Sequence, residues 1–341
     1  MGMMNTSKVM MIAVVLVTTS FVILSVPVYA QGGTNGGNSD AYVCAHYFSP
    51  AQVYDLSTST CTISGPVVLS IDSPRTVNFH TNIIVTNGGS LTIPQGDSFS
   101  ILGSFTIGGN GQLLSGGKFD NIGSTTVQSS VQESTGYAVN SILNGDGGVF
   151  INHGTLSLSN SHDTFGFENY GRFVNHGTVT IDNTDTLAST YGLSFGFVNY
   201  AGTFTNYGTI TISNTGFTVG LVNGHKALLN NYGTIDISSG LNSHAGLWNQ
   251  NVFNNYGTVT ITGCGGYEIY ENGPAGVTIN NYGTIIISNK ASSSQIDTGI
   301  YIHAGDFYNY GSIYIWDATA EAYAGTITEV NGGSISYSSP P

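Results

Sequence analysis

The chain has 341 residues, of which only 7% are charged, and its 19 acidic and 6 basic side chains give a formal net charge of -13. So few Lys and Arg residues cannot neutralise many phosphates, which excludes a typical nucleic-acid-binding protein. With 47 Gly and 20 Tyr residues, the chain also differs from an ordinary globular domain, in which about a quarter of the residues are charged.

The first thirty residues have the organisation of a secretory signal peptide. Lys8 precedes an apolar run from Val9 to Leu24, and the segment ends on the small-residue pattern Val28-Tyr29-Ala30. We therefore expect residues 1–30 to be removed on export, which predicts a secreted or cell-surface protein. An uncleaved anchor is the alternative. No later apolar run is long enough to cross a bilayer, so no membrane span is expected in the mature chain.

A short region is expected between this leader and the repeats that follow. Residues 31–41 are rich in Gly and Asn, which predicts a flexible linker. Residues 42–64 are predicted to cap the first coil against edge pairing, and they contain Cys44 and Cys61. In an oxidising compartment these two cysteines can form a disulfide worth about 3 kcal/mol. Cys264 is left over and is expected to be a buried thiol or, alternatively, an intermolecular bridge.

From residue 65 to residue 338 one motif recurs with a period of roughly 25 residues. It consists of Asn, Tyr or His, Gly, and Thr or Ser, and a strand of alternating apolar residues follows it. A second apolar segment ends at the motif Asn, and a third lies upstream and ends at residues such as Asn272 and His303. The clear copies begin at Asn152, Asn175, Asn206, Asn231, Asn255, Asn281 and Asn309, and their glycines are Gly154, Gly177, Gly208, Gly233, Gly257, Gly283 and Gly311.

Three short strands in each repeat, with no helical periodicity, predict an all-β parallel β-helix of about ten coils. Each strand would pair with the same strand of the next coil, about 4.8 Å away. Ile, Leu and Phe would fill the interior. The motif Gly would supply a corner with positive φ, and the motif Asn amides would stack on one another. Residues 339–341 are expected to form a tail.

These Phe-x-Asn-x-Gly-Thr-apolar-x-apolar repeats resemble the passenger regions of secreted adhesins and haemagglutinin-type surface proteins. They are more distantly similar to the pectin-lyase-like superfamily, and the resemblance covers residues 65 to 338. It implies a right-handed, single-stranded parallel β-helix, also called a β-solenoid. It does not indicate one function, because this architecture hosts adhesins, polysaccharide lyases, glycosidases and tailspike-like proteins.

The second residue of the motif predicts an aromatic row on the outside of the solenoid. Such a row could stack on sugar rings, or its rings could stack on one another. A neighbouring Thr row is similar to the arrays of ice-binding β-helices, but Asp236, Ile286 and Tyr314 interrupt it. The tyrosines of the aromatic row are Tyr207, Tyr232, Tyr256, Tyr282 and Tyr310, and His153 and His176 hold the same motif position.

The ionisable side chains do not predict a catalytic, metal or cofactor site. Glu268 with Glu271 and Asp182 with Asp185 are the nearest acidic pairs, and we interpret both as solvated loop residues rather than as glycosidase carboxylates. Asn183-Thr184-Asp185 matches one motif of polygalacturonase-type hydrolases, but the other motifs of that family are missing. The histidines are scattered about one per coil, so stacking explains them better than metal binding.

The sequence therefore predicts a non-catalytic secreted or cell-surface protein with a structural, adhesive or fibre-forming role. The alternative is an extracellular protein that binds or degrades polysaccharide, through the Tyr row or through loops 184–194 and 290–298. The expected partners are polysaccharide, cell-envelope components, or further copies joined end to end. The sequence alone does not distinguish adhesion from polymerisation.

Overall fold

The computed structural model describes residues 40–48, 52–69, 76–86, 88–109, 111–129, 142–160, 165–183, 195–214, 219–239, 244–274, 276–288 and 298–337. They belong to one compact unit, Asn38–Pro341. The predicted signal peptide, most of the predicted linker, loop 184–194, most of loop 290–298 and the tail lie outside the described residues.

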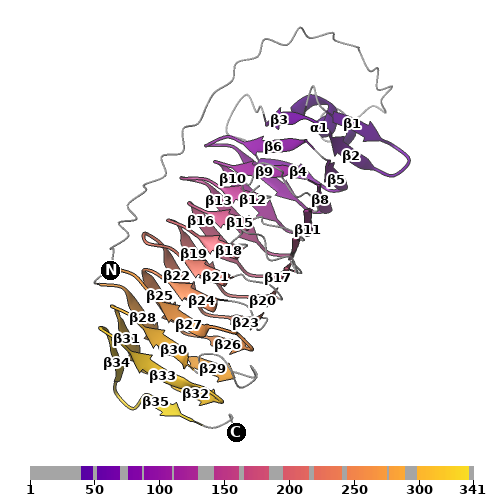
Figure 1. Ribbon diagram of the computed structural model, residues 1–341. Coiled ribbons are helices and arrows are strands. Elements are labelled where there is room, and N and C mark those ends of the chain that lie inside the picture. The colour runs from indigo at the N-terminus through magenta and orange to yellow at the C-terminus, as the bar shows by residue number, and fades with distance from the viewer. Residues whose placement is uncertain are drawn as a thin grey trace, which may run out of the picture. The chain divides into compact units, whose positions relative to one another are not determined.

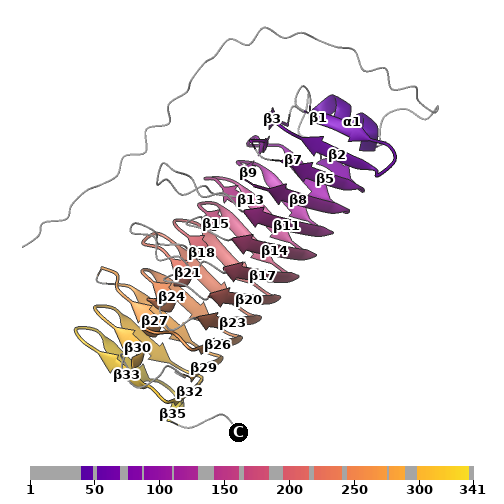
Figure 2. The same ribbon diagram turned by 45° about the vertical axis from the view of Figure 1, so that its right-hand side comes forward.

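Three parallel sheets run side by side along the long axis and form a β-solenoid (Figures 1 and 2). Along the chain the strands pass from sheet A to sheet B to sheet C and back to sheet A, so each turn adds one strand to each sheet. This confirms the predicted all-β parallel fold with three strands per coil. The 13, 11 and 11 strands of the sheets agree with an expectation of about ten coils.

Most strands contain four to six residues, as expected for sides that are separated by tight corners. Sheet A contains β1 (Gln52–Asp55), β2 (Thr60–Ile63), β5 (Asn82–Val85), β8 (Ser104–Gly108), β11 (Ser124–Ser129), β14 (Thr155–Asn160), β17 (Thr178–Asn183), β20 (Thr209–Asn214), β23 (Thr234–Ser239), β26 (Thr258–Thr262), β29 (Thr284–Ser288), β32 (Ser312–Trp316) and β35 (Ser334–Ser336). Sheet B contains β3 (Pro66–Val68), β6 (Ser90–Ile93), β9 (Gln112–Ser115), β12 (Ile142–Asn144), β15 (Phe165–Asn169), β18 (Phe195–Asn199), β21 (Val219–Asn223), β24 (Ala245–Asn249), β27 (Tyr267–Glu271), β30 (Thr298–Ile302) and β33 (Thr319–Ala322). Sheet C contains β4 (Thr76–Phe79), β7 (Ser98–Ile101), β10 (Lys118–Asn121), β13 (Val149–Asn152), β16 (Arg172–Asn175), β19 (Thr203–Asn206), β22 (Leu228–Asn231), β25 (Val252–Asn255), β28 (Thr278–Asn281), β31 (Asp306–Asn309) and β34 (Thr326–Glu329).

Helix α1 (Asp40–Tyr47) and strand β1 cover the first coil at the N-terminal end of the solenoid (Figure 2). Strand β1 runs antiparallel to β2, unlike the other described strand pairs, which are parallel. A disulfide joins Cys44 in the helix to Cys61 in β2, and Phe48 packs on Phe79 of the first sheet C strand. This helix was not predicted, and it begins two residues before the expected cap.

The interior is one continuous hydrophobic core, to which each coil contributes side chains that pack on those of the adjacent coils. In β20, Ile210 and Ile212 are buried while the threonines between and before them face outward. Sheet C contributes a file of aromatic rings, in which Phe173 lies 5.5 Å from Phe150 and 4.9 Å from Phe204 between ring centroids. Because burial of each such side chain contributes about 1.5–3 kcal/mol, and most contacts are made with the coils above and below, stability comes from stacking.

Candidate functional site

The predicted aromatic row lies at the corner where each strand of sheet C passes into the next strand of sheet A. In a typical coil, β22 ends at Asn231, Tyr232 and Gly233 form the corner, and β23 begins at Thr234. The N–H groups of Tyr232 and Gly233 donate to the backbone carbonyl of Asn206 in the preceding coil, at 2.7 and 3.1 Å. Each corner is therefore positioned by the one before it, and the motif side chains repeat in rows.

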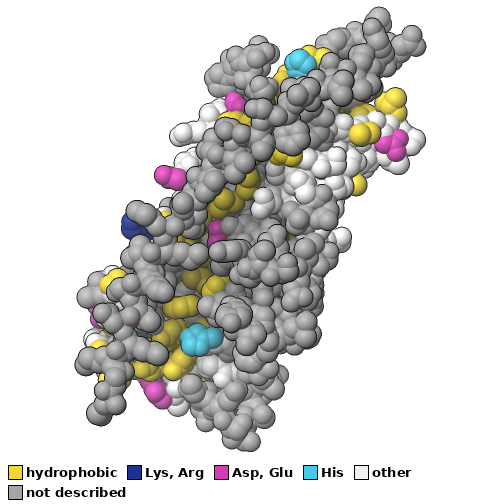
Figure 3. Space-filling model, turned by 45° about the horizontal axis from the view of Figure 1, so that its top comes forward, with side chains coloured by type: hydrophobic (Ala, Val, Ile, Leu, Met, Phe, Trp, Pro, Cys, Tyr) yellow, Lys and Arg dark blue, Asp and Glu magenta, His cyan; other side chains and the backbone are white. Residues whose placement is uncertain are grey.

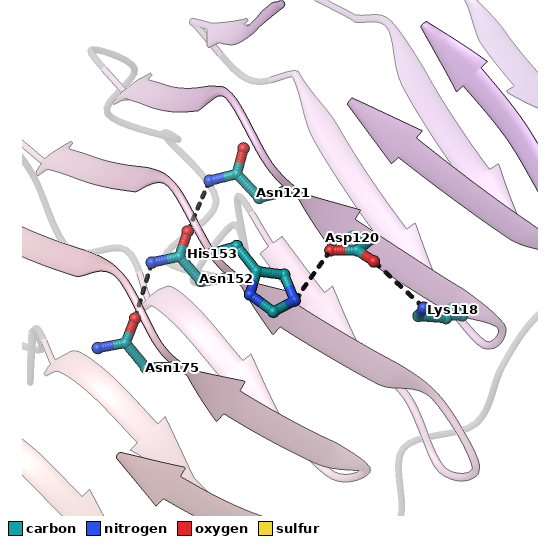
Figure 4. A network of polar contacts seen from close by, with 6 residues as sticks. All are labelled: Lys118, Asp120, Asn121, Asn152, His153 and Asn175. Atoms are coloured by element: carbon teal, nitrogen blue, oxygen red, sulfur yellow. Dashed lines mark hydrogen bonds and ion pairs between the residues drawn. The ribbon is translucent and has the colours of Figure 1, made fainter. Parts of the chain in front are cut away.

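The motif asparagines point inward and form a ladder of buried side-chain amides. Asn206 Nδ2 donates to Asn231 Oδ1 at 2.8 Å and also to the backbone carbonyl of Thr234 at 3.1 Å. The ladder begins at Asn121, one coil before the first clear copy of the motif (Figure 4). This copy of the motif was not recognised in the sequence, because Ile122 occupies the position of the aromatic residue. The members of the ladder are Asn121, Asn152, Asn175, Asn206, Asn231, Asn255, Asn281 and Asn309.

The prediction that the motif glycines have positive φ is wrong. Positive φ is found at other glycines, such as Gly88 and Gly147, and at none of the seven motif glycines. The reason for glycine is steric, since a Cβ on Gly208 would overlap the carbonyl oxygen of Gly177, and one on Gly233 would overlap that of Gly208. Glycine is thus required because neighbouring coils approach closely at this corner.

The aromatic side chains of the motif lie outside the same corner and stack on one another. Successive ring centroids are 4.7 to 5.1 Å apart, and successive ring planes lie within 12° of each other. Tyr207 is 51% exposed and Tyr256 is 44% exposed. We call this feature the ring row, and it consists of His153, His176, Tyr207, Tyr232, Tyr256, Tyr282 and Tyr310.

Stacking determines which atoms of the ring row meet the solvent. Each inner ring has a neighbouring ring against both of its faces, so its exposed part is its edge, which in the tyrosines carries the phenol hydroxyl. Burial, and then the neighbouring Tyr232 and Tyr282, raise the pKa of Tyr256, which keeps its hydroxyl protonated at neutral pH. The ring row therefore presents a line of hydrogen-bonding groups, and within the row no ring face is free for a sugar.

Uncharged polar rows flank the central part of the ring row. On the sheet C side, Asn254 Nδ2 donates to Asn230 Oδ1 at 2.9 Å, and Asn280 Nδ2 donates to Asn254 Oδ1 at 2.8 Å. On the sheet A side, the first threonines of β23, β26 and β29 are partly exposed. Rows of amides, phenols and hydroxyls thus run beside one another over three coils, and the one charged side chain on these strands is Asp236, two residues beyond Thr234.

A charged group lies beside the N-terminal end of the ring row (Figure 4). Asp120 Oδ1 is 3.8 Å from His153 Nε2, and Asp120 Oδ2 is 3.2 Å from Lys118 Nζ. Asp120 is only 9% exposed, so two cationic or potentially cationic neighbours compensate its carboxylate. Lys118 and Asp120 lie in β10, whereas His153 lies in the corner after β13, so these residues meet because one coil stacks on the next.

A second ladder of buried amides occupies the corner between sheet B and sheet C. Asn144 Nδ2 donates to Asn169 Oδ1 at 2.7 Å, and the ladder continues through Asn199 and Asn223 to Asn249. From the sequence, the third apolar segment was expected only to end at an Asn or His, with no ladder at that position. The signal was visible, because an Asn follows the third apolar segment in five successive coils.

The next coil replaces this asparagine with Glu271, which corrects the predicted strand ends at Asn272 and His303. Glu271 pairs with Asn249, and Ile302 pairs with Glu271, so both strands end one residue earlier than predicted. Glu271 is fully buried and accepts hydrogen bonds from three backbone N–H groups, including that of Gly305 at 2.9 Å. The carboxylate substitutes for the missing amide by capping the following corner.

Glu268 is also buried, so the prediction of a solvated Glu268 and Glu271 pair is wrong. Glu268 points into the interior at a position that Gly196, Gly220 and Gly246 hold in the preceding coils. Neither carboxylate oxygen makes a hydrogen bond of ordinary geometry with the described residues. Burial raises the pKa of Glu268 to about 8, and the nearby backbone N–H groups of Glu268 and Cys264 only partly offset this effect. Glu268 is therefore protonated at neutral pH.

The remaining candidates do not converge on one place. Asp182 is exposed, and Asp185 lies outside the described residues. Within the described ranges, no group of three or more His, Cys, Asp and Glu side chains is placed to hold a metal ion. His244 contacts Trp248 and Tyr270, and Cys264 is a buried thiol that takes no part in the disulfide.

Sheet B carries a second hydrophobic cluster on its outer face, which the sequence analysis missed. Val198 and Val222 are only 3% and 7% exposed and belong to a cluster against which Trp248 and Tyr270 pack. Figure 3 shows hydrophobic side chains in a band that follows the long axis of the molecule. In the sequence, this cluster is indicated by an apolar or aromatic residue that directly follows the inward-facing residue of each of these strands.

Comparisons with known proteins return no relative of this chain. No family model matches it, and neither the curated proteins nor the solved structures contain a match. Among the described residues, no helix is long and apolar enough to cross a membrane.

Proposed function

We propose that this protein is a non-catalytic, secreted or cell-surface scaffold that adheres to polysaccharide through the ring row. The observation that carries the proposal is the repetition of the same phenol, amide and hydroxyl groups at one spacing over successive coils. A surface that repeats along one axis is complementary to a polymer that repeats along one axis. Many weak contacts then add up to a useful affinity.

Two further features support export and adhesion. The leader-like residues 1–30 and the disulfide between Cys44 and Cys61 are typical of proteins that work in an oxidising compartment. The repeats resemble those of secreted adhesins, which hold a binding surface on a long rigid solenoid. The proposal therefore places the ring row outside the cell.

The burial of three described carboxyl groups supports a non-catalytic role. Glycoside hydrolysis needs two carboxyl groups on either side of one bond. Glu268 and Glu271 are both fully buried, and Asp120 is largely buried beside Lys118. None of these three carboxyl groups is placed to attack a polymer that lies on the ring row.

The test is a binding assay of the purified chain on insoluble and immobilised polysaccharides, both neutral and acidic. Replacing three central rings by alanine, at Tyr232, Tyr256 and Tyr282, should lower the affinity at least about tenfold, which corresponds to about 1.4 kcal/mol. Tyr200→Ala is the matched control, because Tyr200 is 55% exposed at a different corner. Circular dichroism would establish that both variants remain folded.

Three results would contradict the proposal. The first is a native chain that retains no polysaccharide at all, and the second is a triple alanine variant that binds as well as the native chain does. New reducing ends or unsaturated ends on the polysaccharide would show that the protein is catalytic.

A further inference from the structure

The stacking of the ring row restricts the kind of polysaccharide that it can hold. Sugars that bind aromatic side chains by stacking lie on a ring face. A second ring inserted between two tyrosines would need a centroid separation of about 7 Å, twice a carbon–carbon contact distance. From Tyr207 to Tyr310 the separation never exceeds 5.1 Å. A polymer on this row therefore meets ring edges and hydroxyl groups.

These groups are held rigidly in their positions. Each central ring is clamped between two others, and the Asn254 amide is hydrogen-bonded to Asn230 on one side and Asn280 on the other. Their spacing follows the distance between coils, about 4.8 Å, which the backbone hydrogen bonds set. These rigid rows of side chains cannot close around a flexible polysaccharide chain. When they bind a polysaccharide that is equally ordered, however, neither the protein side chains nor the ligand lose conformational entropy.

The charges of the protein select against acidic polymers. The strand pairs β22–β23, β25–β26 and β28–β29 contain no Lys or Arg, their one charged residue is the partly exposed Asp236, and the chain has a formal net charge of -13. A polyanion would be repelled by the acidic protein and would find no cation along these rows. A neutral polymer rich in hydroxyl groups would be free of this repulsion and could exchange hydrogen bonds with each row.

We infer that the ring row binds edge-on, through its phenol hydroxyls, to the surface of an ordered neutral polysaccharide, and not to single soluble sugar chains. This inference rests on the proposed function and narrows it to one class of ligand and one set of atoms. The ordered surface supplies hydroxyl groups at fixed intervals, so several phenols are satisfied at once. A short soluble chain engages few of them and must first be immobilised.

The experiment measures binding of the full chain to microcrystalline cellulose and to crystalline chitin, with soluble oligosaccharides of each as competitors. Phenylalanine at positions 232, 256 and 282 (Tyr232→Phe, Tyr256→Phe and Tyr282→Phe together) keeps the stack and removes three hydroxyls. The expected result is retention on a crystalline polymer, no competition by millimolar-range oligosaccharide, and at least about a tenfold loss of affinity in the triple variant, since each neutral hydrogen bond contributes about 0.5–1.5 kcal/mol. Tyr200→Phe should bind as the native chain does.

The outcomes separate this inference from the broader proposal. If the triple phenylalanine variant binds normally while the triple alanine variant does not, ring contacts hold the ligand, and the inference is wrong although the proposed function stands. Effective competition by soluble oligosaccharide, or binding to acidic polysaccharides alone, also overturns the inference. A native chain that binds no polysaccharide overturns both.

Discussion

Asn206 donates a hydrogen bond from Nδ2 to Oδ1 of Asn231, 2.8 Å away in space and one coil further along the chain. The same bond recurs from Asn121 to Asn309, always with the donor in the earlier coil. Hydrogen bonds that point the same way polarise one another, which strengthens such a chain in a dry interior. The ladder is therefore expected to make the coils cooperative, and the loss of one amide to affect both neighbours.

The first prediction concerns the ladder. Asn231→Ala removes the side-chain donor to Asn255 Oδ1 and leaves this buried oxygen unsatisfied. It also removes the acceptor of one Asn206 hydrogen bond and the bonds from Asn231 Nδ2 to the backbone carbonyls of Gly233 and Thr258. We expect a loss of about 2–4 kcal/mol in the free energy of unfolding. The adjacent Asn230 faces outward, and Asn230→Ala should cost less than about 0.5 kcal/mol. Denaturant unfolding, with hydrogen exchange to locate the opening, tests the pair, and equal losses would contradict the role of the ladder.

The second prediction concerns the motif glycines. In Gly208→Ala the new methyl group would collide with the carbonyl oxygen of Gly177, so the two coils must separate. A loss of about 3 kcal/mol is expected. Gly145→Ala is the control, because a Cβ at Gly145 lies 3.5 Å from the nearest carbonyl oxygen, that of Ser115, and its φ is not positive. Thermal unfolding should separate the two variants, and similar melting temperatures would show that close approach is not the reason for glycine.

The third prediction concerns pH and Glu268. Its pKa is about 8 in the folded protein and near 4.5 when unfolded, so between these values the unfolded chain releases a proton that the folded chain keeps. The contribution of Glu268 to the free energy of unfolding should therefore be highest below about pH 4.5 and fall until about pH 8, by up to about 1.4 kcal/mol per pH unit. Glu268→Gln should remove this contribution.

Denaturant unfolding of the native chain and of Glu268→Gln at about pH 5 and about pH 8 provides the measurement. The variant should gain stability relative to the native chain as the pH rises, because glutamine does not ionise. A difference between the two proteins that is the same at both pH values would show that Glu268 is ionised in the folded state.

The fourth prediction concerns the disulfide of the N-terminal cap. Replacing Cys44 and Cys61 together by serine should reduce the stability of the cap by about 3 kcal/mol, since the bond closes a loop of 17 residues. Hydrogen exchange should become faster in α1 and β1 and stay unchanged in β26, because each coil contacts only its neighbours. Faster exchange throughout the solenoid would mean that the cap controls the stability of every coil.

The fold could be predicted from the sequence because the repeat determines it locally. Alternating residues such as Ile210 and Ile212 define an inward face without reference to other coils, and seven copies of Asn-aromatic-Gly place the corners. Helix α1 was not predicted, since its eight residues lack the apolar spacing of an amphipathic helix. The row of Tyr207 to Tyr310 could also be predicted as a row on the outside, since one motif position carries it.

Only the tertiary structure decided what these rows do, because each contact joins residues that lie about one coil apart. The close approach that demands Gly208, the covered faces of Tyr256 and the burial of Glu268 all depend on the coils above and below. The register that places Glu271 rather than Asn272 in the ladder depends on pairing with β24. The sequence by itself thus determined that the chain coils and which residues recur. The packing of one coil on the next determined that the ring row presents hydroxyl edges instead of ring faces.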